Sequence, residues 1–163
     1  ALDTIMCFIT KLGNAGILWI LLAAVLIAIP KTRKSGVIVM VALVFDVILC
    51  NGILKNLVGR IRPCDINTAV QLLVPRPTDF SFPSGHTAAS FTAVTALYCA
   101  GEKKLWKISL VLAVLIAFSR LYLYVHYPTD ILGGILVGLL CGYIGSVAGK
   151  YLYKTAEKKL ANR

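Results

Sequence analysis

Residues 131–152 read ILGGILVGLLCGYIGSVAGKYL, and this stretch decides the fold. No charged residue interrupts it before Lys150, and about 20 apolar residues are the length an α-helix needs to cross a hydrocarbon core roughly 30 Å thick. Small residues recur along it at Gly134, Gly138, Gly142, Gly145 and Gly149. Such a stripe lets membrane helices approach closely, either inside one bundle or at a dimer seam. The stretch therefore predicts a membrane-spanning helix, and we expect its glycines to pack inside the bundle.

Four other apolar stretches resemble it, at about residues 15–29, 37–54, 87–100 and 105–124. The 163-residue chain is 58% hydrophobic and 15% charged, with a mean hydropathy of +0.82, which excludes an ordinary soluble domain. Strand-like alternation is absent, and an open sheet would leave its edge amides unpaired in lipid. We predict an all-α fold, a polytopic transmembrane helix bundle with five full spans, forming a single integral-membrane domain over residues 1–163. Because stretches 15–29 and 87–100 are short, their helices must extend into flanking residues, tilt or be buried by neighbours.

Residues 2–12 form a different kind of segment. Apolar residues recur at helical spacing, with polar ones between them: Leu2, Ile5, Met6, Ile9 and Leu12. The segment is too short to span a bilayer, so we predict a short amphipathic helix that lies in the membrane interface. A signal peptide is not expected here, because a basic leader and a small-residue cleavage site are missing.

The net charge of +10 raises the question of a nucleic-acid partner. Most of the basic residues fall into three clusters between or after the spans: Lys31, Arg33 and Lys34; Lys103, Lys104 and Lys107; Lys150, Lys154, Lys158, Lys159 and Arg163. Five crossings place these clusters on the same side, which the positive-inside rule makes cytoplasmic. We therefore predict a multi-pass protein of the bacterial cytoplasmic membrane without a nucleic-acid partner.

Three polar motifs lie in the connections on the opposite, extracytoplasmic side. They are Lys55-(six residues)-Arg62-Pro63, Pro83-Ser84-Gly85-His86, and Ser119-Arg120-(five residues)-His126-(three residues)-Asp130. With five crossings, both connections that carry them emerge on one membrane face, so we expect the motifs to meet there.

The cations of these motifs indicate an anion site. Three of them gather, and the nearby acids Asp65, Asp79 and Asp130 are too few to make the cluster merely structural. Snorkelling to the interface is the alternative for a lone cation at a span end. Planar arginine side chains match phosphate oxygens with two hydrogen bonds, so the pattern favours phosphate.

The other two motifs supply a turn and a histidine–carboxylate pair. The turn opens a helix, where free amides and the Ser84 hydroxyl form an anion pocket; a simple helix cap is the alternative. Pro128 is expected to start the last helix, which places Asp130 where it reaches back to His126. A carboxylate on one imidazole nitrogen leaves the other free to attack. The alternative is a capping aspartate beside an interfacial histidine.

Together the three motifs resemble the signature motifs of the type-2 phosphatidic acid phosphatase superfamily, which includes membrane lipid phosphatases and the soluble vanadium haloperoxidases. Every specified position matches. The apolar composition favours the membrane branch, similar to bacterial phosphatidylglycerol phosphate and undecaprenyl diphosphate phosphatases. Members usually have six transmembrane helices, and here residues 2–12 stand in the place of the first.

The resemblance implies a role for each motif residue. The implied phosphate-binding groups are the side chains of Lys55, Arg62, Arg120 and Ser84 and the backbone amides of Gly85 and His86. His126 is the implied nucleophile, Asp130 orients it, and His86 is the acid and base. Pro63, Pro83 and Ser119 are implied to support the site. The implied mechanism passes through a phosphohistidine and needs no metal or other cofactor. The implied partners are the bilayer and a membrane lipid phosphate: undecaprenyl diphosphate, phosphatidylglycerol phosphate or phosphatidic acid.

Two alternatives use the same basic cleft. A lipid phosphotransferase would pass the phosphate to another lipid, and a non-enzymatic anion or lipid transporter would only bind it. Asp46 and Asn51 inside the second span are the features that favour transport, because an acid within a span is by default a functional hypothesis. Asp46 precedes Lys55 by nine positions, about 13 Å along a helix, so we expect it to form an interhelical hydrogen bond rather than reach the phosphate.

Overall fold

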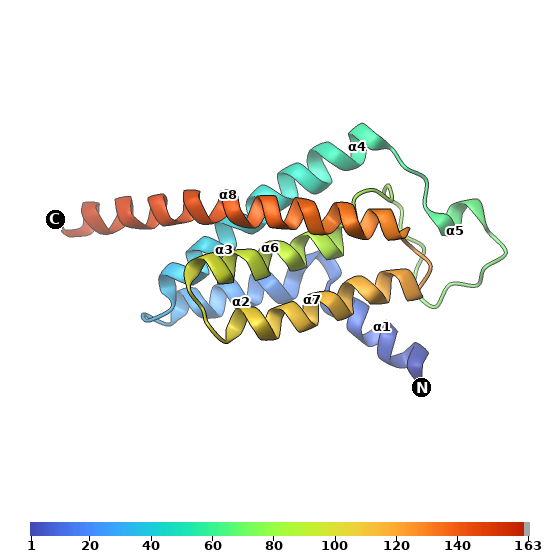
Figure 1. The fold of residues 1–163 in the computed structure, drawn as a ribbon, viewed down its shortest axis with the longest axis horizontal. Coiled ribbons are helices and arrows are strands. Elements are labelled where there is room, and N and C mark those ends of the chain that lie inside the picture. Colours follow the sequence, from blue (N-terminus) through green and yellow to red (C-terminus); the bar gives the residue numbers. More distant parts are fainter. Residues whose placement is uncertain (162–163) are drawn as a thin grey trace.

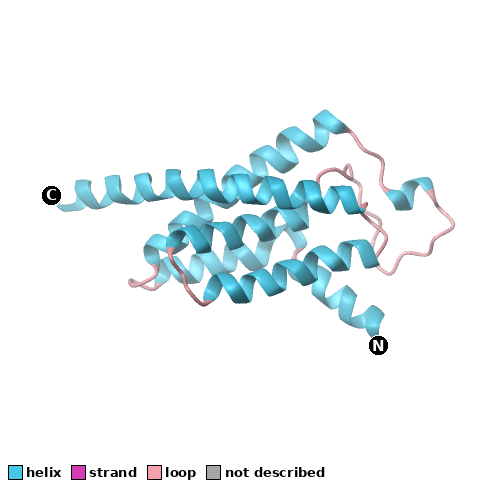
Figure 2. Ribbon diagram, in the orientation of Figure 1, coloured by secondary structure: helices cyan, strands magenta, loops and turns pink. Residues whose placement is uncertain are grey.

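The computed structural model describes residues 1–161, and within them every regular element is helical (Figure 2). The elements are α1 (Leu2–Leu12), the 3₁₀-helix η1 (Asn14–Gly16), α2 (Ile17–Ala28), α3 (Arg33–Asp46), the π-helix η2 (Val47–Leu54), α4 (Lys55–Val58), α5 (Pro63–Ile66), α6 (Gly85–Ala100), α7 (Leu105–Tyr122) and α8 (Pro128–Ala161). A helix lies over each of the five apolar stretches, so the all-α prediction is confirmed.

Helix α6 lies at the centre of the bundle, packed against α3, α7 and α8 (Figure 1). Ten of its sixteen residues are buried, including the polar Ser90 and Thr92. The Trp19 indole of α2 donates a hydrogen bond of 3.0 Å to the Ser90 hydroxyl across this core. The short, polar composition of residues 87–100 thus has a physical reason: this helix is surrounded by other helices.

The glycine stripe of α8 packs within the same chain. A Cβ added at Gly138 would lie 2.7 Å from the carbonyl oxygen of Ala88 in α6, and one at Gly149 would lie 2.8 Å from Cα of Ile38 in α3. These distances are shorter than any real Cβ contact, so the absence of a side chain lets the backbones touch. The expectation of internal packing is confirmed.

The number of spans differs from the prediction. Three helical segments are long and apolar enough to cross a membrane, Arg33–Ile66, Leu105–Tyr122 and Pro128–Ala161, and a fourth is added if the bent pair Leu2–Leu12 and Asn14–Ala28 counts as one span. The pair bends by 44° because Ala15 and Gly16 adopt positive φ angles of 50° and 66°. Helix α6 is shorter than a span. Five full spans are therefore not confirmed.

The motifs and the basic clusters lie at opposite ends of the bundle. The connections that carry the first two basic clusters, between α2 and α3 and between α6 and α7, lie at the end toward which the C-terminal part of α8 extends (Figure 1). The α4–α6 connection, the start of α6, the end of α7 and the start of α8 gather at the other end. The three motifs therefore meet at one end of the bundle, as expected.

Candidate active site

Arg62 lies at the centre of the cluster that the three motifs form. It is 2% exposed, and its guanidinium contacts two connections at once. Nη1 donates to the Val125 carbonyl oxygen at 2.8 Å and to Nε2 of His126 at 3.1 Å, while Nε donates to the Asp79 carbonyl oxygen at 2.8 Å. One side chain of the first motif therefore positions the histidine of the third.

Asp79 is a member of this cluster that we did not assign to the site. Its carboxylate forms an ion pair with the buried Lys55, and Oδ1 lies 2.7 Å from Nη2 of Arg62. Partial burial alone would raise the pKa of Asp79, but the hydrogen bonds and charges of Lys55 and Arg62 outweigh it and lower the pKa to about 2. Two of the three predicted phosphate-binding cations are thus paired with a carboxylate, which corrects the expectation that the nearby acids leave the cations unbalanced.

The tautomer of His126 follows from its neighbours. Arginine has no acceptor, so Nε2 must accept the Arg62 hydrogen bond and the proton must sit on Nδ1. Burial lowers the pKa of His126 to about 4, aided by the charges of Arg62 and Arg120 and opposed by the bond to Asp130. The imidazole is therefore neutral at pH 7, with its lone pair directed at the cations.

Asp130 has more partners than the sequence indicated. Its Oδ2 lies 3.4 Å from Nδ1 of His126, a long contact, and accepts stronger bonds from the Ser81 hydroxyl at 2.5 Å and the Tyr127 amide at 2.9 Å. Its Oδ1 accepts from Nη1 of Arg60 at 2.9 Å. Asp130 thus ties three connections together as well as facing the histidine. Arg60 and Ser81 were missed, although each lies two positions before a motif residue.

Arg120 approaches the cluster from α7 and is buried. Its Nη1 donates to the hydroxyl of Thr10 in α1 at 2.5 Å, and its buried Nε has no hydrogen-bond partner in the part of the chain that the structure describes. A buried guanidinium with a free donor is suited to an anion. Helix α1 therefore contributes Thr10 to the edge of the site.

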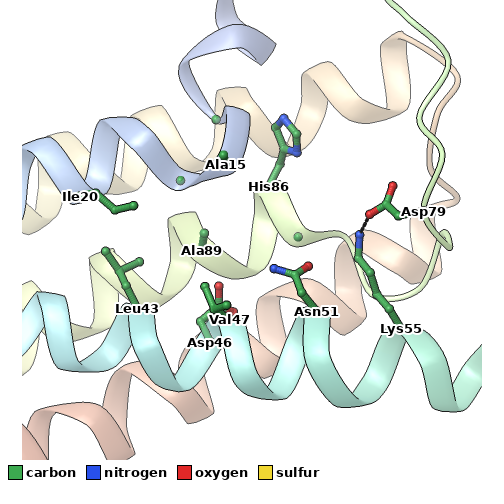
Figure 3. Close-up of a pocket in the computed structure, with 13 residues that line it drawn as sticks. Ala15, Ile20, Leu43, Asp46, Val47, Asn51, Lys55, Asp79, His86 and Ala89 are labelled. Atoms are coloured by element: carbon green, nitrogen blue, oxygen red, sulfur yellow. Dashed lines mark hydrogen bonds and ion pairs between the residues drawn. The ribbon is translucent and has the colours of Figure 1, made fainter.

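His86 faces a pocket between α6 and η1 (Figure 3). Its Nε2 lies 2.9 Å from the amide oxygen of Asn14, which fixes that nitrogen as a donor. Asn14 was also missed. The only feature of the sequence that singles out Asn14 is its position between Gly13 and Gly16. In the structure, the first pair of helices bends at this position.

The remaining motif residues shape the backbone. The Ser84 hydroxyl caps α6, accepting hydrogen bonds from the Thr87 amide at 3.5 Å and the Thr87 hydroxyl at 3.0 Å. A Cβ at Gly85 would lie 3.2 Å from Oδ1 of Asn51, so this glycine leaves room beside Lys55. The Ser119 hydroxyl donates to the Ile116 carbonyl oxygen at 2.6 Å. Pro63 begins α5 and Pro83 precedes the α6 cap.

A cavity of about 310 Å³ extends from this cluster toward the middle of the bundle. Lys55, Asp79 and His86 lie at its outer end, while Asp46, Leu43 and Ile20 lie deeper (Figure 3). The site is therefore open to a molecule whose anionic end reaches the cations and whose remainder lies between helices.

Fold and site define a class: an apolar helical bundle that holds a buried histidine beside clustered cations at one end. Residues 35–154 match the model of the PAP2 superfamily, and the chain belongs to that superfamily. The predicted relationship to type-2 phosphatidic acid phosphatases is confirmed, and the apolar helices together with transmembrane relatives identify a membrane protein.

Sequence relatives carry phosphatase names. The chain is 34% identical to an undecaprenyl-diphosphatase of Sulfolobus acidocaldarius over 84% of its own length and 66% of the relative's. It is 34% identical to phosphatidylglycerophosphatase B of Bacillus subtilis, with 88% and 73% of the two chains covered. The chain thus spans about two thirds of the length of the first of these relatives.

Two solved structures share the fold. The crystal structure of Aquifex aeolicus LpxE superposes with a TM-score of 0.75 at 31% identity, covering 88% of this chain and 84% of the other. A transmembrane PAP2-type phosphatidylglycerolphosphate phosphatase from Bacillus subtilis superposes with a TM-score of 0.71 at 31% identity, covering 92% and 77%.

Proposed function

We propose that the protein is a metal-independent lipid phosphate phosphatase that acts through a phosphohistidine. One observation carries the proposal: Arg62 donates to the attacking nitrogen of His126 and pairs with the carboxylate that also holds Lys55. A nucleophile and two cations therefore share one site. A phosphate that replaces the Asp79 carboxylate would be held by Lys55, Arg62 and Arg120.

The first step transfers the phosphoryl group to His126. The Nε2 lone pair of His126 leaves its hydrogen bond with Arg62 and attacks phosphorus, and the bond from phosphorus to the leaving oxygen breaks. His86 enters this step as the imidazolium, with a proton on each nitrogen, and gives its Nδ1 proton to that oxygen. Asn14 accepts the Nε2–H of His86 and so leaves Nδ1 for this transfer. Asp130 stabilises the positive charge on His126.

The second step returns the enzyme to its starting state. His86 takes a proton from water, the water oxygen attacks phosphorus, the phosphorus–nitrogen bond breaks, and orthophosphate leaves. One water molecule is consumed in all. Fixed cations neutralise the phosphoryl charge throughout, so the two histidines and the cations suffice.

The bilayer setting is part of the proposal. We place the whole chain in the membrane as one domain, with α6 and the bent first pair completing the bundle, the basic clusters in the cytoplasm and the site on the extracytoplasmic face of a cytoplasmic membrane. The positive-inside distribution supports this orientation. Undecaprenyl diphosphate and phosphatidylglycerol phosphate are candidate substrates that the names of the relatives suggest. Phosphatidic acid is a third candidate, implied by the resemblance of the motifs.

The test is phosphate release by detergent-purified protein from these three lipids in the presence of EDTA. We expect release by the natural protein and a loss of at least about 1,000-fold in His126→Ala, because the nucleophile is removed. Quenching the reaction of a phosphate-radiolabelled lipid in alkaline denaturant should trap phosphate on His126 of the natural protein, because the phosphorus–nitrogen bond of phosphohistidine survives alkali and hydrolyses in acid. Near-normal turnover by His126→Ala would rule out the phosphohistidine. Labelled phosphate that appears on a second lipid instead of in solution would identify a phosphotransferase.

A further inference from the structure

The π-helix η2 turns a buried acid toward the site. Nine residues separate Asp46 from Lys55, which is two and a half turns of an α-helix and would point the two side chains to opposite sides. The wider π turn, with hydrogen bonds from residue i to i+5, changes this register across Val47–Leu54. Asp46, Asn51 and Lys55 consequently all line the cavity (Figure 3). Asp46 lies in the deep part of this cavity, so its predicted position too deep for the phosphate is not contradicted.

The Asp46 carboxyl group has an unused hydrogen-bonding position. The residue is 1% exposed, and within residues 1–161 its buried Oδ1 has no hydrogen-bond partner. Within the described residues, no polar side chain of α6 donates a hydrogen bond to this oxygen. The structure therefore does not show the predicted interhelical hydrogen bond. An unpaired buried acceptor is costly unless a ligand completes it.

The cavity lies on the side of the site where a leaving group departs. Its lining contains Gly85, the acid His86 and Lys55, but not the nucleophile His126. In-line transfer places the attacking nitrogen and the leaving oxygen on opposite sides of phosphorus. The part of the substrate that becomes the product alcohol therefore extends into this cavity, past Asn51 and toward Asp46.

Two side chains with acceptor oxygens line the deep part, the Asp46 carboxyl group and the Asn51 amide, whose nitrogen is also a donor. Oδ1 of Asn51 faces the Gly85 position, and Asp46 lies one turn further in. Lys55, at the outer end, is the one cation among the residues that line the cavity within residues 1–161. The deep part thus suits a neutral group that donates hydrogen bonds, and it offers no cation to a second phosphate.

We propose that Asp46 and Asn51 form a subsite for a hydrogen-bond donor, a hydroxyl or an amide N–H, on the leaving group of a lipid phosphomonoester. The inference rests on the proposed function and narrows its substrate class. It favours phosphomonoesters of hydroxyl- or amide-bearing lipids over phosphatidic acid, whose esters only accept hydrogen bonds, and over a polyprenyl diphosphate, whose leaving group is itself an anion.

The experiment compares two phosphomonoesters with matched chains, ceramide 1-phosphate and phosphatidic acid, in the same detergent. Ceramide 1-phosphate carries a hydroxyl and an amide N–H beside the phosphate, so it probes the donor requirement directly. We expect the natural protein to prefer it in kcat/KM, and we expect Asp46→Leu to lower the ratio of the two kcat/KM values about tenfold, the typical effect of one buried hydrogen bond. Asp46→Asn keeps an acceptor oxygen and should retain most of the ratio.

A matched control removes a buried polar atom elsewhere. Thr92 Oγ1 in α6 is also buried without a partner but does not line the cavity, so Thr92→Val should leave the ratio unchanged. If Asp46→Leu and Asp46→Asn both keep the natural ratio of the two kcat/KM values, the subsite proposal is wrong. Hydrolysis of the two lipids in that case still supports the proposed phosphatase. Absence of hydrolysis of every lipid by the natural protein would overturn the proposed function and the subsite with it.

Discussion

Asp79 forms an ion pair with Lys55 at the point where the first and second motifs meet. The second oxygen of the same carboxylate contacts Arg62 at 2.7 Å, so one carboxylate bridges two cations as two oxygens of a phosphate would. The Asp79 side chain is 53% exposed, and its connection carries it to the rim of the cavity. The anion site is thus occupied by a group that belongs to the chain and that an incoming phosphate must displace.

Asp79→Asn should strengthen the binding of phosphate analogues. The amide no longer competes for Lys55 and Arg62, while the Arg62 bonds to the Asp79 and Phe80 carbonyl oxygens still hold the connection. We expect the inhibition constant for vanadate to fall about three- to tenfold, a modest change because the Asp79 carboxylate is half exposed. Asp65→Asn, which breaks an ion pair with Arg76 in the same connection, is the control and should leave inhibition as it is. Weaker inhibition of Asp79→Asn would show that the carboxylate positions the cations instead of competing.

Arg60→Ala should slow turnover, although Arg60 lies outside the predicted motif positions. Its guanidinium holds Asp130 and Thr129 and lies 4.1 Å from the centre of the Tyr127 ring, so its loss frees the connection that carries His126. We expect kcat to fall about tenfold with little change in KM, because orientation is lost and phosphate contacts are kept. Arg76→Ala removes a comparable exposed arginine and serves as the control. An equal loss in both variants would mean that Arg60 has no special role.

The titration of His126 should be displaced far to the acid side. The chain has two histidines, so the His86→Ala protein labelled with ¹³C-histidine should show a single imidazole resonance in detergent micelles. We expect its midpoint near pH 4 instead of the usual 6.5. A midpoint near pH 6.5 would contradict the buried, cation-flanked setting.

The same shift predicts how stability depends on pH. Between pH 6.5 and about 4 the unfolded chain binds a proton at His126 that the folded chain does not, so acidification across this window favours unfolding. The stability that the neutral, buried imidazole of His126 contributes is fully present above pH 6.5 and is lost as the pH falls toward 4. Thermal unfolding scans of the natural protein and His126→Gln should converge as the pH falls toward 4, whereas parallel curves would contradict the assignment.

Gly138→Ala should destabilise the bundle. The new methyl group would lie 2.7 Å from the carbonyl oxygen of Ala88, and neither backbone can retreat without separating α6 from α8. We expect a loss of about 1–3 kcal/mol in the free energy of unfolding, measured by denaturant titration in micelles. Gly52→Ala is the control, because the nearest atom to its new methyl group lies 3.7 Å away. Equal stability of the two variants would show that the helices are not in close contact.

Much of the architecture was predictable because local sequence determines it. The apolar stretches predicted the helices, and the glycine repeat predicted a close contact. The span number was not predictable, since it depends on tertiary burial: α6 is surrounded by other helices and need not be long. The bend at Ala15 and Gly16 also depends on backbone angles that composition does not reveal.

The site was predictable where residues belong to motifs and unpredictable where they support them. Lys55, Arg62 and His126 meet as expected. Asp79 and Asn14 reach the cluster from connections whose course the sequence does not specify. That Asp46 lines the same cavity as Lys55 could not be predicted, because one π-helical segment changes which face of the helix a residue occupies.

Helix α8 carries Asp130 in its first turn and Lys150 twenty residues later. At 1.5 Å per residue this separation is about 30 Å, the thickness of an average hydrocarbon core. A continuous helix of that length fixes the distance between the residues that it places at the two membrane surfaces. If Lys150 stays in the headgroup region of one leaflet, the catalytic carboxylate is held level with the headgroups of the other. A thicker bilayer would draw the site below its substrates and a thinner one would lift it clear of them, so hydrophobic mismatch becomes a determinant of turnover.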